Sequence, residues 1–155
     1  SFAKLLNMPF LNIHYPLDQL GRNRMIAAID ENLPQNNTTV EDVVKALQTL
    51  PEFQEADTNI KVRIGNLEDP VRKVVVSHGA GTNGGFDVGK TYYDNGVDTL
   101  IYIHIHYSDY KKLREYENKG NLIVTGHIVS DLIGINPFIK KLKKNNIVVD
   151  RVSGL

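Results

Sequence analysis

Two short segments of this chain combine histidine and carboxylate at spacings that could hold a metal ion. Residues 14–18 read HYPLD and contain His14 and Asp18, and residues 126–131 read GHIVSD. If a helix begins close to Gly126, His127 and Asp131 lie four residues apart on one helical face, where both can reach the same ion. Imidazole and carboxylate ligands suit Zn, Mn, Fe or Ni. A metal site is therefore the first hypothesis.

Each segment also has a purely structural interpretation. Asp131 could stabilise the positive first turn of a helix while His127 hydrogen bonds locally, and Asp18 with His14 could do the same. A positive helix N-terminus does not favour a cation, so the carboxylate and further ligands must outweigh it. The two segments together are stronger evidence than either alone, because neighbouring parallel strands would bring both to one edge of a sheet.

A second histidine pair, His104 and His106, falls in the best predicted strand, where both side chains share one face. Such a pair can ligate a metal, and the ordinary alternative is that one ring packs while the other reaches water. His104 could line the same site, because the glycine-rich residues 79–85 let a ligand approach closely. Its position on the strand face is the reason for proposing it as a proton shuttle or substrate ligand. His78, at the end of its own predicted strand, is a weaker candidate of the same kind.

A third candidate is a phosphate-binding loop. Residues 84–91, GGFDVGKT, match the pattern G-x-x-x-x-G-K-[ST], and residues 147–150 could form the strand that directs an acidic residue to magnesium. However, residues 79–83 separate the preceding strand from the pattern, residues 86–88 look helical, and Asp87 would lie beside a phosphate. A glycine-rich turn with Lys90 on a solvated helix face is the interpretation that we favour.

Composition limits the classes of function. Eighteen basic and eighteen acidic residues cancel, so no global positive field attracts nucleic acid, which is not an expected partner. The absence of cysteine excludes disulfides and thiolate metal sites. No signal-peptide pattern or membrane-length apolar run is present, which predicts a cytoplasmic protein without membrane attachment. A chain of 155 residues predicts one domain with its own core.

Strands alternate with helices along the chain. Strands are predicted at residues 10–14, 59–65, 74–76, 98–107, 122–125 and 147–152. Helices are predicted at residues 17–31, 38–50, 86–96, 108–120 and 130–144. These bounds place Asp18 at a strand-to-helix junction. Thr38 and Glu41 have the spacing of a capping box at the start of the second helix. In the second strand, Lys61 and Arg63 alternate with apolar residues. The pattern predicts a layered α/β domain with a mixed or largely parallel sheet flanked by helices.

These segments resemble the Nif-three-like family (NGG-one-interacting factor three), whose members are also described as type 2 GTP cyclohydrolase I homologues. Residues 14–18 resemble the family's HTNLD-type segment, residues 79–85 its glycine-rich turn and residues 126–131 its GHxxSE segment. Residues 86–104, a helix followed by an apolar strand, fit as well. The order of the segments matches along nearly the whole chain, which implies a Nif-three-like α/β fold.

The resemblance implies that residues 1–155 form a single domain, the larger C-terminal part of a longer protein, with a centre of two metal ions. By position, Asp18 would bind one or both ions, His127 and Asp131 would complete the C-terminal contribution, and His14 would lie close by. The family has glutamate at the position of Asp131, one methylene longer. Its further His-His ligand pair lies upstream of the first motif and has no counterpart here.

From the residues and the resemblance together we predict a divalent-metal-binding, hydrolase-like protein in which the metal activates water for attack on a small-molecule substrate. Such a site would suit phosphate-bearing or nucleotide-like substrates once metal is bound. The family implies homo-oligomers, commonly hexameric toroids. A non-enzymatic metal-binding or oligomeric scaffold protein is the alternative, and a P-loop nucleotide-binding protein is a third possibility.

Overall fold

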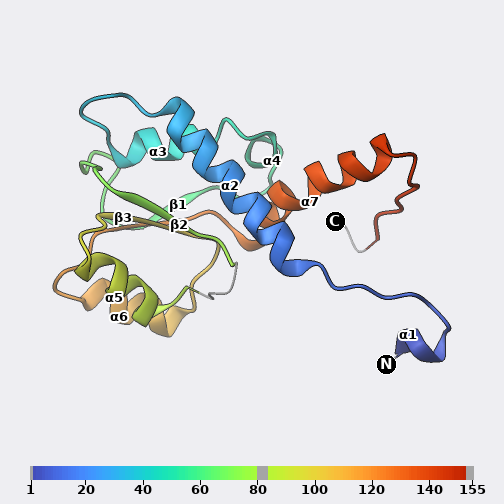
Figure 1. Cartoon of the computed structure of the whole chain (residues 1–155). Helices are drawn as coiled ribbons and strands as arrows, with labels where there is room; N and C mark the ends of the chain where they lie inside the picture. The colour runs from blue at the N-terminus through green and yellow to red at the C-terminus, as the bar shows by residue number, and fades with distance from the viewer. Residues whose placement is uncertain (1, 80–83, 153–155) are drawn as a thin grey trace.

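A four-stranded mixed sheet forms the centre of the chain (Figure 1). The computed structural model describes residues 2–79 and 84–152. The strands are β1 (Lys61–Ile64), β2 (Val74–Ser77), β3 (Thr99–Tyr102) and β4 (Asn121–Val124). Their order is β1-β4-β3-β2, with β2, β3 and β4 parallel and β1 antiparallel to β4. The predicted α/β class with a mixed sheet is confirmed.

Helices lie on both sides of this sheet (Figure 1). One side carries α2 (His14–Asn32), α3 (Val40–Leu47) and α4 (Pro51–Gln54), with α7 (His127–Lys144) packed along α2. The other side carries α5 (Phe86–Asp94) and α6 (Tyr107–Glu115), and a short α1 (Phe2–Leu5) precedes the body. Within residues 2–79 and 84–152, no helix has the length and apolar character to cross a membrane.

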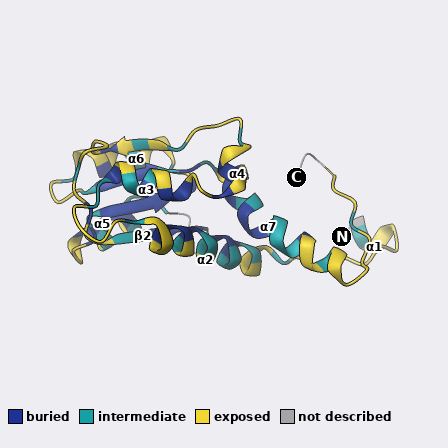
Figure 2. Cartoon of the chain, turned by 90° about the horizontal axis from the view of Figure 1, so that it is seen from above, coloured by how far each residue is buried: buried dark blue, intermediate teal, exposed yellow. Residues whose placement is uncertain are grey.

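The sheet separates two apolar cores. Side chains alternate across the inner strands β3 and β4, so Ile101 and Ile123 pack toward α2 and α3, whereas Leu100 and Leu122 pack toward α5 and α6. The two inner strands, β3 and β4, are almost entirely buried, whereas the segment between α1 and α2 is mostly exposed (Figure 2). Because β2, β3 and β4 are parallel, their carboxyl ends lie at the same edge of the sheet.

The two predicted terminal strands are wrong. Residues 10–13 and 147–152 have no regular structure; Phe10 is 80% exposed and Val148 is 88% exposed. An apolar run becomes a strand only where a neighbour can pair with its backbone, and no strand of the described residues lies beside either segment. Asp18 accordingly lies in the second turn of α2, not at a strand-to-helix junction.

Three further boundaries differ from the sequence pattern. The strand predicted at residues 98–107 stops at Tyr102, so His104 and His106 share no strand face. The capping box of α3 uses Thr39 and Asp42, one residue beyond the predicted pair, because aspartate can also fill its third position. In β1, a register shift between Val62 and Ile64 interrupts the predicted alternation.

Candidate metal centre

The first two turns of α2 and of α7 carry the same arrangement of histidine and aspartate. Helix α2 begins at His14 with Asp18 four residues later, and α7 begins at His127 with Asp131 four residues later. Nε2 of His14 lies 3.3 Å from Oδ1 of Asp18, and Nε2 of His127 lies 3.4 Å from Oδ2 of Asp131. The predicted placement of His127 and Asp131 on one helical face is confirmed, and the N-terminal pair takes the same form.

Two glycines bring these helices into backbone contact. Gly21 and Gly134 each follow the aspartate of their helix by three residues. A Cβ at Gly134 would lie 2.1 Å from the carbonyl oxygen of Leu17, and a Cβ at Gly21 would lie 2.9 Å from Nε2 of His78. Only glycine permits this approach. The same pattern, H-x-x-x-D-x-x-G, therefore occurs in both helices, at residues 14–21 and 127–134. This repeat is a signal in the sequence that could have linked the two segments.

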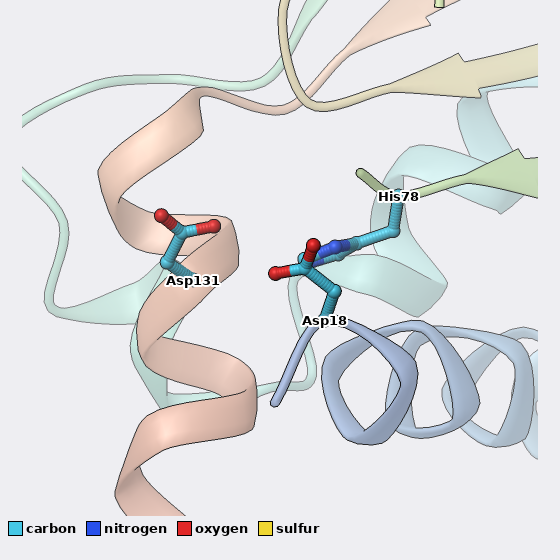
Figure 3. A group of neighbouring side chains, drawn as sticks. All are labelled: Asp18, His78 and Asp131. Atoms are coloured by element: carbon cyan, nitrogen blue, oxygen red, sulfur yellow. The ribbon is translucent and has the colours of Figure 1, made fainter. Parts of the chain in front are cut away.

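His78, which follows β2, joins the two aspartates. One ligand atom from each of Asp18, His78 and Asp131 lies within 4.8 Å of the others. Figure 3 shows these three side chains approaching one another from α2, the end of β2 and α7. Asp18 is 5% exposed and His78 is 1% exposed. From the sequence His78 was a weaker candidate than the others, because a single histidine at a strand end does not show which side chains lie opposite it in the fold.

Two atoms of this group lack hydrogen-bond partners. Nε2 of His78 lies 2.9 Å from the carbonyl oxygen of Ser130. Because that oxygen only accepts, Nε2 carries a proton, and in the neutral ring Nδ1 then presents a lone pair. In residues 2–79 and 84–152, Nδ1 of His78 and Oδ1 of Asp131 are the buried side-chain atoms without a partner. An unpaired buried acceptor costs about 1–3 kcal/mol, so a cation between these atoms would be stabilising.

The donor chemistry therefore fits a divalent cation. A carboxylate from each helix and an imidazole nitrogen from the sheet edge are ligands used by zinc and manganese. A ligating histidine usually donates its second ring N–H to a protein acceptor, which fixes the ring; the bond from His78 to Ser130 has this form.

A solved structure resembles this chain along almost its entire length. It is the crystal structure of a NIF3 superfamily protein from Sphaerobacter thermophilus, which is 50% identical with a TM-score of 0.93. The match covers 99% of this chain and 56% of that one. This chain belongs to the NIF3 superfamily. The family resemblance inferred from the motifs is therefore confirmed. The chain spans little more than half the length of that relative.

The other comparisons add little to this NIF3 superfamily assignment. A Bacillus cereus protein related to NIF3 is 16% identical, with a TM-score of 0.49, over 79% of this chain and 33% of that one. No family model matches the sequence, and no curated protein matches it significantly.

The charges of this NIF3 centre act as one cluster. Burial raises the pKa of the Asp131 carboxyl above its ordinary value. The neighbouring charge of Asp18 acts in the same direction, whereas His127, His78 and His14 oppose it. All three histidines are therefore close enough to influence the same carboxylate.

His104 joins this cluster through His127. The two rings stack with centroids 4.7 Å apart and planes at 10°. Burial lowers the pKa of His104, and His127 acts in the same direction while Asp131 opposes it. His106 lies apart from His104, at the start of α6, where its Nδ1 is 2.8 Å from Oγ of Ser108. The predicted His-x-His pair therefore does not form.

Most of the P-loop pattern of this NIF3 chain, from Phe86 onward, lies within a helix. Helix α5 begins at Phe86, so Lys90 and Thr91 lie inside it and cannot wrap a phosphate. Nζ of Lys90 is 2.5 Å from Oδ2 of Asp94, one turn later. Residues 80–83 of the predicted glycine-rich turn lie outside the described residues. The interpretation of residues 86–88 as helix is confirmed.

A partly buried ion pair links α2 and α7 to α4. Nη1 of Arg24 lies 2.9 Å from Oε1 of Glu52 and donates to the carbonyl oxygen of Ile133 at 2.6 Å. Asn136 of α7 also donates to Oε1 of Glu52, at 3.1 Å. Burial raises the pKa of Glu52, but these hydrogen bonds outweigh it and hold the pKa below its ordinary value. The two aspartate-bearing helices therefore share a charged anchor beyond their glycine contact.

Proposed function

We propose that this chain binds a divalent metal ion between Asp18, His78 and Asp131 and acts as a hydrolase-like protein. The observation that carries the proposal is the buried His78, whose Nδ1 lone pair has no partner although two carboxylates lie within reach. A divalent ion held there would act as a Lewis acid and make water a nucleophile near neutral pH.

His14 and His127 would extend the ligand set. Each contacts one of the two carboxylates, and the side chains of both are more than half exposed, so they are free to turn toward an ion. With His78 they give three imidazoles and two carboxylates, enough donors for one ion or for two. The arrangement supports the dinuclear centre that the resemblance implies. Asp131, shorter than the family's glutamate, has His78 as an additional neighbouring donor.

Metal titration tests the proposal. Zn²⁺ and Mn²⁺ are titrated by calorimetry into the chain after chelator treatment and dialysis, and into His78→Gln and Asp131→Ala. We expect at least one ion per chain and an affinity at least ~10-fold lower in each variant. His106→Asn is the matched control, because His106 lies outside the cluster and asparagine can still cap α6. Failure of the parent chain to bind either ion, or unchanged binding in His78→Gln, would contradict the proposal.

Hydrolysis is tested separately from binding. We expect metal-dependent turnover on a panel of phosphoesters, lost in Asp131→Ala and reduced in His104→Ala, for which we propose a role as proton shuttle or substrate ligand. Stoichiometric metal binding without turnover on any substrate would favour the non-enzymatic alternative. Full turnover in His104→Ala would remove the role of that histidine.

A further inference from the structure

A pocket of about 480 Å³ opens beside the metal centre. It lies where β3 and β4 end, and His127 and His104 form part of its wall. Crevices at the carboxyl ends of parallel strands are the usual ligand sites of open α/β sheets. The volume falls within the range of about 300–1,000 Å³ that small-molecule sites occupy. His127 thus lines the pocket and also contacts Asp131 of the metal centre.

Most of the pocket wall is apolar. Ile103 and Ile105 come from the segment after β3, and Ile128 and Val129 come from the first turn of α7. The stacked rings of His104 and His127 add a flat surface. These side chains would bury the apolar or aromatic body of a ligand.

Two cations of β1 supply the charge of the pocket. Lys61 and Arg63 both line it, and no aspartate or glutamate of the described residues does. The guanidinium of Arg63 lies 4.7 Å from the ring centroid of Tyr110, which holds it in place. Neither cation forms an ion pair with a carboxylate within residues 2–79 and 84–152. Their positive charge is therefore available to a ligand.

The strand that carries both cations is irregular at Arg63. Val62 pairs with Ile123 and Ile64 pairs with Leu122, so two residues of β1 advance while β4 advances one. Arg63 is the extra residue of this β-bulge. In a regular strand Val62 and Ile64 would share a face, but here they pack into different cores. Bulges are common beside functional sites, and this one lies in the strand that contributes Lys61 and Arg63 to the pocket.

We propose that this pocket binds the substrate of the metal centre, a small molecule with an apolar body and one phosphate or carboxylate group. Lys61 and Arg63 hold the anionic group, and the uncapped first turn of α7 adds favourable N–H dipoles. The apolar body lies against the isoleucines, next to His127 and the metal ligands. Assigning this ligand as a substrate rests on the proposed function, whereas binding of the anion does not require metal.

Ligand titration into the chelator-treated chain tests the pocket without turnover. The probes are 1-naphthyl phosphate, 1-naphthoate, neutral 1-naphthol and inorganic phosphate, followed by naphthalene fluorescence or calorimetry. We expect at least one naphthyl anion to bind at least ~10-fold more tightly than naphthol and inorganic phosphate, because charge and apolar body are both needed. The tighter of the two anions identifies the charged group.

Variants locate the binding. The double variant Lys61→Ala/Arg63→Gln is expected to lower the affinity for the preferred anion at least ~10-fold. Lys143→Ala, which removes an exposed charge from the last turn of α7, should leave it unchanged. Equal binding of naphthol and both anions, or unchanged anion affinity in the double variant, would overturn the proposal.

Metal titration separates this proposal from the previous one. The double variant should bind Zn²⁺ as the parent chain does, because neither residue belongs to the metal cluster. If the parent chain binds Zn²⁺ and no naphthyl anion, the pocket proposal fails and the metal centre stands. If it binds the anion through Lys61 and Arg63 but no metal, the anion site stands and its role as a substrate site fails.

Discussion

The two sides of the sheet differ in whether their buried polar side chains all have hydrogen-bond partners. On the side of α5 and α6, the hydroxyl of Tyr93 donates to the carbonyl oxygen of Asn121 at 2.9 Å, and that of Tyr102 donates to Gly85 at 3.1 Å. Burial raises the pKa of both phenols, which keeps them protonated as donors. On the side of α2 and α7, His78 and Asp131 each keep an acceptor atom without a partner. Among the described residues, the first layer leaves no buried side-chain acceptor unpaired, whereas the second leaves two, which the proposed cation would satisfy.

The helices of the two layers also meet differently. Gly134 of α7 faces a backbone carbonyl of α2, which cannot move without shifting a helix. Gly89 of α5 faces the side chains of Leu113 and Tyr102, with closest distances of 3.0 and 3.1 Å from a Cβ. Side chains can adjust by a few tenths of an ångström. The contact between α2 and α7, beside the proposed metal centre, therefore tolerates less change in geometry than the packing of α5 on α6.

Gly134→Ala should have the largest effect on stability. The added methyl group cannot fit beside the Leu17 carbonyl, so α2 and α7 must separate, at a cost of about 3 kcal/mol or more. The separation would also part Asp18 from Asp131 and weaken Zn²⁺ binding. Chemical denaturation and calorimetry measure the two effects. The matched variant Gly89→Ala should cost about 1 kcal/mol or less, because better helix propensity offsets the closer packing. Similar losses in both variants would refute the contrast between the layers.

Metal should stabilise the incomplete layer. At a free Zn²⁺ concentration 100 times the dissociation constant, the free energy of unfolding should rise by about 2.7 kcal/mol, which a thermal melt detects as a higher Tm. At the same Zn²⁺ concentration, His78→Gln should gain much less, since it lacks the buried imidazole. His106→Asn should gain as much as the parent chain. An equal gain in all three proteins would mean that Zn²⁺ binds elsewhere.

Much of the fold followed from local sequence pattern, and the errors follow from contacts between distant residues. The apolar runs before His78 and Gly126 became β2 and β4, and the spacing of His127 and Asp131 placed both on α7. The terminal apolar runs failed as strands because local pattern does not show whether a partner strand exists. The position of His78 beside the two aspartates could not be predicted for the same reason, since it depends on how α2 packs on α7.

Glu52→Gln should destabilise the helices behind the metal centre in a pH-dependent way. The folded pKa of Glu52 lies below the ordinary value of 4.5, so its charge stabilises the fold above about pH 4.5, and this contribution is lost as pH falls through the folded pKa. We expect a loss of about 2 kcal/mol at pH 7 and almost none at the lowest pH where the chain stays folded. Urea titrations across pH measure the difference, and a pH-independent loss would contradict the assignment.

Lys90→Ala should have the smallest effect, although its segment matches a nucleotide-binding motif. Nζ of Lys90 pairs with Asp94 on the exposed face of α5, and an exposed pair within one helix contributes little. Neither Zn²⁺ affinity nor the naphthyl-anion affinity of the pocket should change. Calorimetry with Mg²⁺ and ATP should show no binding that depends on Lys90. ATP binding abolished by Lys90→Ala would restore the P-loop interpretation and place a functional site in the layer that we assign to the scaffold.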